Sequence, residues 1–365
     1  MNFFETFVSK ESIDLVNECM KSGRLSAGKR AEDFEQLLHT TLGLENVVTV
    51  NSGTSALHLA IILSGVKPGD EVILPAQTFI ATGLAIKYAG AIPIFCDINL
   101  SDGCINTDDI KAKITDKTKA IMCVDWAGYP CDLDELMQIG KKYGISIIED
   151  AAHSIGATYK LRPVGSISDF TCFSFQAIKH LTTGDGGAVC CKNPEDALRA
   201  KNLRWFDIDR DHSKIDILGE RVYDAQNIGY KYHLNDYAAC MGIGNIGHIK
   251  DNLHRVRTIA SQYDDAFKNV EQITLMDYKS NRMSSYWLYP MLVGNRNEFI
   301  TKLKSCGIPT SVVHIGIDKN AVFGGKQINL INQRMFEFLQ IHIPINYNLT
   351  DDEVSHIIDT IKDGW

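Results

Sequence analysis

Short apolar segments alternate with stretches of helical periodicity along the first half of the chain, and this alternation constrains the fold more than any other feature. Strands that alternate with helices form a mostly parallel sheet with helices on both faces. We therefore predict an α/β fold in which a ligand binds beyond the carboxyl ends of the strands. The expected strands are residues 47–50, 71–74, 91–97, 120–125 and 145–150.

The length and the pattern of the second half predict two domains. At 365 residues the chain is long enough for two domains of roughly 150 residues each. A long helical stretch over residues 250–267 precedes strands mixed with helices, and residues 350–353 form a capping box that opens a last helix. We predict a larger domain over residues 1–249 and a smaller α+β domain over residues 250–365.

The charge and the cysteine spacing exclude several classes of function. A formal net charge of -8 and a pI of about 5.8 argue against nucleic acid or an anionic membrane as partner, because both require a basic face. The ten cysteines show no repeated Cys-x-x-Cys spacing, so we expect no metal and a reducing compartment. The start lacks a secretory pattern and no apolar stretch reaches membrane-spanning length, which predicts a cytoplasmic protein.

The turn from Asn51 to Ser55 is a candidate phosphate site. It joins the expected strand 47–50 to an apolar helix, so free backbone N–H groups and the positive end of the helix dipole meet there. Such a place suits a phosphate group. Thr54 and Ser55 add hydroxyl groups that either bind the anion or cap the helix. The glycine motifs of dinucleotide and nucleoside-triphosphate sites are absent.

Lys179 and Asp150 stand where catalytic groups are expected. Lys179 lies between the apolar run 173–175 and a glycine-rich turn. Partial desolvation there would lower the pKa of the lysine and make its amine a nucleophile. Asp150 ends the strand 145–150, and His153 follows on the next turn. Taken singly, each residue also allows a structural interpretation: a solvated loop lysine, a helix cap and a hydrogen-bonded core histidine.

Five motifs in order decide between these interpretations. They are Asn-Ser-Gly-Thr-Ser-Ala-Leu at 51–57, Thr-Phe at 78–79, Glu-Asp-Ala-Ala-His at 149–153, Ser-Phe-Gln-Ala-Ile-Lys at 174–179 and Gly-Asp-Gly-Gly at 184–187. With them the chain resembles, over nearly its whole length, the sugar aminotransferases of the DegT/DnrJ/EryC1/StrS family. The resemblance implies a fold-type I pyridoxal phosphate (PLP) enzyme. Its large domain would hold a mostly parallel seven-stranded sheet, and two subunits would form a homodimer with shared active sites.

The resemblance also implies a role for each motif residue. Lys179 would form the Schiff base with the cofactor and carry a proton between cofactor and substrate. Asp150 would pair with the pyridinium nitrogen and keep the ring an electron sink. Phe79 would stack on the cofactor ring, and His153 would lie near the ring and its 3-hydroxyl. The cofactor phosphate would be held by Gly53, Thr54 and Ser174.

Three positions depart from the commoner family pattern. Lys231 stands where an asparagine of the partner subunit often reaches the cofactor phosphate, and His233 stands where an arginine is usual. A lysine meets a phosphate as a point charge, so we expect the interface contact to persist with less defined geometry. Gln176 replaces a frequent histidine or tyrosine. The dehydratase branch of the family has histidine in place of the Schiff-base lysine, so Lys179 favours transamination.

These assignments predict a PLP-dependent aminotransferase that moves an amino group from L-glutamate to a nucleotide-linked keto-deoxysugar, for surface polysaccharide or glycoconjugate synthesis. Pyridoxamine phosphate would be the intermediate form of the cofactor, and a 4-keto substrate is favoured over a 3-keto one. Substrate contacts are expected from Gly28, Arg204 and His314. The alternatives are a non-catalytic regulator of the same fold that binds a sugar nucleotide, and a PLP lyase or dehydratase.

Overall fold

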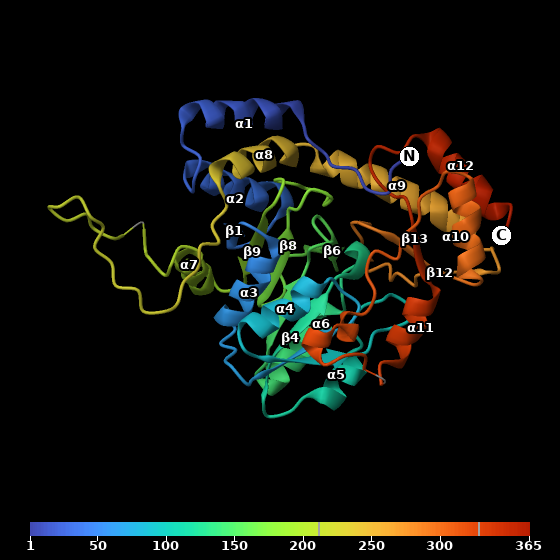
Figure 1. Ribbon diagram of the computed structural model, residues 1–365, viewed down its shortest axis with the longest axis horizontal. Coiled ribbons are helices and arrows are strands. Elements are labelled where there is room, and N and C mark those ends of the chain that lie inside the picture. The colour runs from blue at the N-terminus through green and yellow to red at the C-terminus, as the bar shows by residue number, and fades with distance from the viewer. Residues whose placement is uncertain (211, 328) are drawn as a thin grey trace.

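A seven-stranded sheet lies at the centre of the computed structural model, which describes residues 1–210, 212–327 and 329–365 (Figure 1). The strand order is β1-β9-β8-β5-β4-β2-β3. Only β9 runs antiparallel to its neighbours in this sheet, which confirms the expected mostly parallel arrangement. The strands are β1 (Val47–Val50), β2 (Glu71–Pro75), β3 (Ile92–Cys96), β4 (Thr118–Val124), β5 (Ser146–Asp150), β8 (Phe170–Ser174) and β9 (Gly187–Cys191).

Helices cover both faces of this sheet because successive strand residues point to opposite sides. In β1, Val48 and Val50 join the core of one face and Val47 joins that of the other. One face carries α3 (Gly53–Leu63), α4 (Ile80–Tyr88) and α7 (Pro194–Leu203). The other carries α2 (Lys29–Leu42), α5 (Thr107–Lys113), α6 (Leu133–Tyr143) and α8 (Asp236–Ile246). No helix among the described residues is long and apolar enough to cross a membrane.

The helix α8 packs at very close range because its interior carries glycines. A Cβ atom at Gly244 would lie 2.3 Å from the backbone nitrogen of Ser12 in α1 (Lys10–Ser22). A Cβ atom at Gly242 would lie 2.5 Å from the ring of Phe34 in α2. At the start of α8, Asp236 Oδ1 accepts the N–H of Ala31 at 3.3 Å. Asp236 therefore provides a hydrogen-bond acceptor for one of the first N–H groups of α2, which lack intrahelical partners.

The C-terminal part of the chain builds a second core around a three-stranded antiparallel sheet of order β10-β12-β13. Its core residues extend from Val256 to Ile361, and Thr350 and Glu353 form the expected capping box. The division at residue 250 stays a prediction. The elements are α9 (Ile249–Phe267), β10 (Ile273–Leu275), β12 (Tyr289–Val293), α10 (Arg296–Ser305), β13 (Gln340–Ile343) and α12 (Asp351–Lys362).

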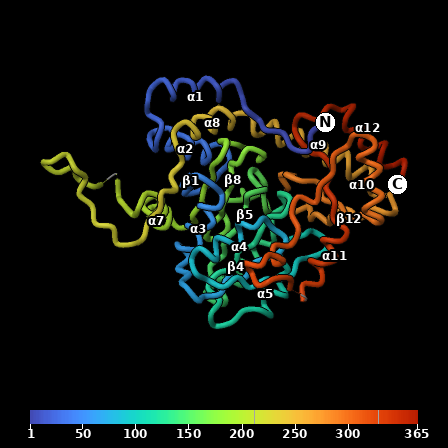
Figure 2. Tube along the Cα trace, in the orientation of Figure 1, coloured from blue at the N-terminus to red at the C-terminus, as the bar shows by residue number. Residues whose placement is uncertain are grey.

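Segments of the second half return to the large sheet and join the two cores. Around α11 (Ile331–Leu339), Leu330 packs into the core of one sheet face and Phe336 into that of the other. The amino terminus lies beside the C-terminal helices (Figure 2), where the Met1 amino group is 3.6 Å from Glu353. The short 3-10 turns are η1 (Trp126–Gly128), η2 (Ile317–Lys319) and η3 (Ala321–Phe323).

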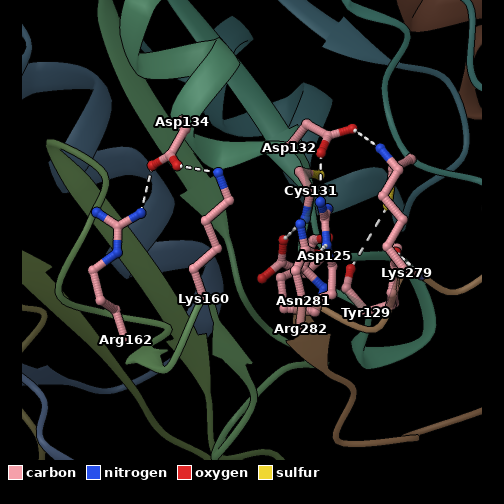
Figure 3. A network of polar contacts seen from close by, with 12 residues as sticks. Asp125, Tyr129, Cys131, Asp132, Asp134, Lys160, Arg162, Lys279, Asn281 and Arg282 are labelled. Carbon is pink, nitrogen blue, oxygen red and sulfur yellow. Dashed lines mark hydrogen bonds and ion pairs between the residues drawn. The ribbon is translucent and has the colours of Figure 1, made fainter.

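A small sheet of order β11-β6-β7 adds a polar connection between the two parts. Its strands are β6 (Thr158–Tyr159), β7 (Arg162–Pro163) and β11 (Arg282–Met283). Two carboxylates at the start of α6 hold this sheet (Figure 3). Asp132 binds Lys279 at 2.9 Å and also Arg282, while Asp134 binds Lys160 and Arg162.

The described residues between 206 and 230 (206–210 and 212–230), which we call the arm, leave the body of the molecule between α7 and α8 (Figure 1). A hydrogen bond of 3.0 Å from Phe206 N to Tyr230 O closes the base of the arm. Beyond it Ile215, Ile217 and Leu218 are 67%, 101% and 81% exposed. Apolar side chains grouped in this way outside a core are typical of an interaction site.

The close contact at α8 generates a stability prediction. We expect Gly244→Ala to lower the free energy of unfolding by about 1–3 kcal/mol, because the new methyl group forces α1 away from α8. Gly247→Ala is the matched control, since a Cβ atom there meets nothing within 4 Å. Urea unfolding followed by circular dichroism measures both variants. Equal midpoints for the two variants would contradict the packing argument.

Candidate active site

A turn that accepts only small residues forms at the start of α3. Ser52 caps the helix by accepting the Ser55 N–H at 3.1 Å, which leaves the first N–H groups of α3 without intrahelical partners. A Cβ atom at Gly53 would lie 2.9 Å from Ser174 Cβ at the end of β8. One at Gly187 in β9 would lie 2.7 Å from Gly53 N. Strands β1, β8 and β9 therefore bring Gly53, Thr54 and Ser174 to one place at the carboxyl edge of the sheet.

Asp150 lies buried at the end of β5, where its carboxylate has two hydrogen-bond donors. Thr82 Oγ1 in α4 donates to Oδ2 at 2.8 Å, and the Ala152 N–H donates to Oδ1 at 3.2 Å. Thr82 in turn lies 2.7 Å from the hydroxyl of Thr78. Burial raises the pKa of Asp150, while the hydrogen bonds and the nearby Lys179 act in the opposite direction.

Lys179 lies on the connection between β8 and β9, which turns at Gly184 with a φ of +83°. Its amine points into the site: Nζ is 3.5 Å from the ring centroid of Trp287. Burial lowers the pKa of Lys179 from its ordinary 10.5 to about 7, and the Asp150 carboxylate opposes this shift. A lysine with such a lowered pKa has a neutral fraction near pH 7 and can act as nucleophile and base.

His153 stacks on the same indole. Its ring centroid is 3.8 Å from that of Trp287 at an interplanar angle of 22°. Ser285 Oγ donates to the backbone carbonyl of His153 at 2.6 Å and helps to hold the segment. Burial and the charge of Lys179 hold the pKa of His153 well below its usual range, so the imidazole is neutral. Among the described residues His153 Nδ1 has no hydrogen-bond partner, although it is buried.

Phe79 and His314 lie at the mouth of the site. Phe79 precedes α4 and is 54% exposed, with its ring centroid 5.3 Å from that of His314. The His314 ring is also 6.0 Å from the ring of His153. Burial lowers the pKa of His314 to about 4, so this imidazole too is neutral near pH 7. Ring contacts thus lead from Phe79 through His314 and His153 to Trp287, whose indole Lys179 contacts.

Gly28 and Arg204 lie apart from this group, beside a separate cavity of about 900 Å³. Among the described residues that line this cavity are neither Lys179 nor Asp150. Arg204 Nη1 is 2.6 Å from Glu35 Oε1 and 2.6 Å from Thr49 O, which gives it structural partners. Gly28 faces Asp236, whose carboxylate would be 2.6 Å from an added Cβ atom. Contacts of either residue with substrate stay predictions.

Lys231 is exposed near the base of the arm and close to its own phosphate-site turn. Its carbonyl accepts the Asn51 side-chain amide at 3.3 Å, and its Nζ lies 5.0 Å from the ring centroid of Trp205. The neighbouring His233 is buried and lies 3.3 Å from Ser26 Oγ. A contact of Lys231 with the partner's cofactor stays a prediction.

Two residues of the site were missed at the level of sequence. Thr82 orients Asp150. Its signal in the sequence was its place four residues after Thr78, a spacing of about one helical turn. Trp287 contacts both Lys179 and His153, yet it precedes β12 in the distant second half, where no motif marked it. Its indole Nε1 donates to Ile178 O at 2.9 Å, which fixes the ring.

Comparison with known proteins shows the family. The sequence profile of the DegT/DnrJ/EryC1/StrS aminotransferase family matches residues 7–362. The chain belongs to this aminotransferase family. It is a PLP-dependent sugar aminotransferase, because members of the family use PLP. The solved structures that it matches include the PLP and pyridoxamine phosphate forms of Spr1654 of Streptococcus pneumoniae.

Individual relatives of this aminotransferase agree with its membership. It is 33% identical to the spore coat polysaccharide biosynthesis protein SpsC of Bacillus subtilis, over 98% of this chain and 95% of that protein. It is 32% identical to GDP-perosamine synthase of Escherichia coli O157:H7, over 96% of this chain and 95% of that protein. Its fold matches the sugar aminotransferase CalS13 of Micromonospora echinospora with a TM-score of 0.94 at 31% identity, covering 100% of both chains.

The residues of the aminotransferase fit the cofactor. The turn at Gly53 offers N–H groups for a phosphate, and Asp150 is a buried carboxylate with few donors. The buried Nδ1 of His153 is left for a polar atom of the cofactor, and the desolvated amine of Lys179 suits a Schiff base.

The pair of Asp150 and Lys179 generates a prediction about protonation. We expect Asp150→Asn to lower the pKa of Lys179 further below about 7, because the carboxylate that favours the ammonium form is removed. The measurement is the pH dependence of reductive methylation of Lys179 in cofactor-free protein, read by mass spectrometry. Asp185→Asn is the control, since this exposed carboxylate in the following turn is not among the causes of the shift. A midpoint that stays or rises in Asp150→Asn would contradict the pairing.

Proposed function

We propose that the enzyme transfers the amino group of L-glutamate to a nucleotide-linked 4-keto-deoxysugar, as a step in surface polysaccharide or glycoconjugate synthesis. The observation that carries this proposal is the desolvated Lys179 amine beside the buried Asp150 carboxylate at the edge of the sheet. Support for the substrate class comes from the names of the relatives, a GDP-perosamine synthase and a spore coat polysaccharide protein.

The residues of the chain have separate tasks in this reaction. PLP, when bound, supplies an electron sink for the substrate carbon. Lys179 Nζ would hold the cofactor and then move the proton at the reacting carbon, for which a pKa of about 7 is well matched. Asp150, oriented by Thr82, would hold the ring nitrogen of the cofactor in its protonated form. Phe79 would cover the ring and exclude water, and the turn at Gly53 would bind the phosphate.

The exposed apolar residues of the arm favour a homodimer with shared active sites. The exposed Ile217 and Leu218 at its tip contact no core of their own subunit, and a second copy would bury them. The base of the arm joins the strand-like bridge between Trp205 and Lys231. Docking of the arm would therefore also position Lys231, the residue that we expect to reach the partner's cofactor phosphate.

The amino transfer is tested in two half-reactions. Adding L-glutamate to the purified enzyme should shift its near-visible absorbance as PLP becomes pyridoxamine phosphate. The pyridoxamine form is then incubated with GDP-, UDP- and dTDP-linked 4-keto- and 3-keto-6-deoxyhexoses, and return of the PLP absorbance identifies the acceptor. A non-catalytic regulator would leave the cofactor unchanged in both steps.

Variants of two lysines sharpen this test. We expect Lys179→Ala to lower turnover roughly 100- to 10,000-fold, because the proton-carrying amine is lost. Lys192→Ala is the control, since this exposed lysine follows the opposite end of β9. Full turnover in Lys179→Ala would refute the proposed mechanism.

The dimer is tested at the tip of the arm. We expect the double variant Ile217→Asp with Leu218→Asp to behave as a monomer, because charged side chains resist burial in an apolar interface. Light scattering coupled to size-exclusion chromatography measures the mass. Leu161→Asp is the control, because Leu161 is 96% exposed on the turn between β6 and β7. A dimeric double variant, or a monomeric unaltered protein, would contradict the role of the arm.

A further inference from the structure

Two buried glutamine amides converge on the backbone of His314. Gln77 Nε2 donates to the carbonyl oxygen of His314 at 3.1 Å, and Gln340 Nε2 donates to the same oxygen at 3.0 Å. Gln77 follows β2 in the large sheet, whereas Gln340 begins β13 in the second core. Both parts of the molecule therefore hold one peptide group at the mouth of the active site.

A third glutamine completes the group. Gln333 Nε2 in α11 donates to Gln77 Oε1 at 2.7 Å, and Gln77 Nε2 also lies 3.3 Å from Gln340 Oε1. All three side chains have an exposed fraction of 0%. Burying amides is unfavourable unless they are hydrogen-bonded to one another, so such a group persists only with a defined geometry. Asp97 fixes the third member, because its Oδ1 accepts the backbone N–H of Gln333 at 2.8 Å.

The peptide that precedes His314 is strained. Val313 has a φ of +53°, a left-handed conformation that β-branched residues rarely adopt. Its N–H is held by Ser311 Oγ at 2.9 Å. Such strain persists where the surroundings over-determine the backbone, and it is concentrated at functional sites. The two amides on the His314 carbonyl contribute to that constraint, together with a local hydrogen bond of 2.6 Å from His314 N to Val312 O.

The constraint has a consequence at the site. Gln77 lies two residues before Phe79, so the amide group couples the turn that carries Phe79 to the loop that carries His314. The two rings lie 5.3 Å apart at the mouth, while Lys179 and Asp150 lie deeper. A sugar that presents its keto carbon to Lys179 would lie beside the His314 imidazole. A neutral imidazole offers one donor and one acceptor, which suits sugar hydroxyl groups.

We propose that Gln77, Gln333 and Gln340 are positioning residues: their buried amides hold His314 in a strained conformation in which its imidazole contacts the sugar of the nucleotide-linked substrate. This inference rests on the proposed function for the identity of the sugar substrate. The glutamate half-reaction does not use this contact, because glutamate carries no sugar. The amide group therefore serves the second half-reaction.

The test uses Gln333→Leu and Gln340→Leu in the full-length enzyme, with Gln138→Leu on the exposed side of α6 as the matched control. The probe is the nucleotide-linked 4-keto-6-deoxyhexose that the pyridoxamine form converts fastest. We expect the KM for this sugar nucleotide to rise about tenfold in both network variants, as expected for loss of one hydrogen bond. The rate of the glutamate half-reaction should stay within about twofold of the unaltered enzyme. Crystal structures of the cofactor-free variants should show Val313 relaxed to a negative φ.

Several outcomes would overturn the proposal. One is an unchanged KM in both variants, and another is a His314 that stays in place without the amides. A merely structural role would lower both half-reactions together with the thermal midpoint. If Gln333→Leu fails to fold, Gln333→Asn keeps a polar group of shorter reach and decides in the same way. An unaltered enzyme that ignores glutamate would refute the proposed function instead, while the Val313 conformation would still decide the positioning role.

Discussion

The partly buried amine of Lys179 is the constraint on which the rest of the site depends. Lys179 loses its hydration inside the protein, and only the Asp150 carboxylate partly offsets that loss. The balance leaves an amine that is free to react near neutral pH. It holds only if Asp150 keeps its place at the end of β5, which Thr82 secures from α4. The chemistry therefore depends on the relative position of strand β5 and helix α4.

Around this pair the protein places neutral aromatic and imidazole groups. Trp287 covers Lys179 and stacks on His153, and burial keeps both His153 and His314 uncharged. An additional cation beside Lys179 would lower its pKa further, and an additional anion would raise it. The surroundings thus leave Asp150 as the main charge that acts on Lys179. These uncharged neighbours therefore affect the reaction through their position and not through a charge.

Much of this site could be predicted from the sequence, because its motifs are local. A strand followed by a glycine turn and a helix predicts a phosphate site within seven residues, and Asp150 and His153 lie on one turn. Trp287 and the three glutamines could not be found in this way. Most of their contacts, such as those of Gln77 with His314 and Gln333, join segments that lie more than 100 residues apart, and hydropathy patterns carry no information about such pairs. Gly28 and Arg204 have structural partners in the fold, and their predicted contacts with substrate stay predictions.

The sequence by itself determined the alternation of strands and helices, the parallel sheet and the motif residues along its carboxyl edge. These features depend on periodicity and on short-range backbone geometry, which neighbouring residues dictate. Only the tertiary structure decided how the second half closes over that edge. Val313 shows why: β-branched residues rarely adopt its left-handed backbone, and the side-chain hydrogen bonds to the adjacent His314 carbonyl come from Gln77, which follows β2, and from Gln340 in β13. Long-range contacts of this kind exist only after the chain has folded.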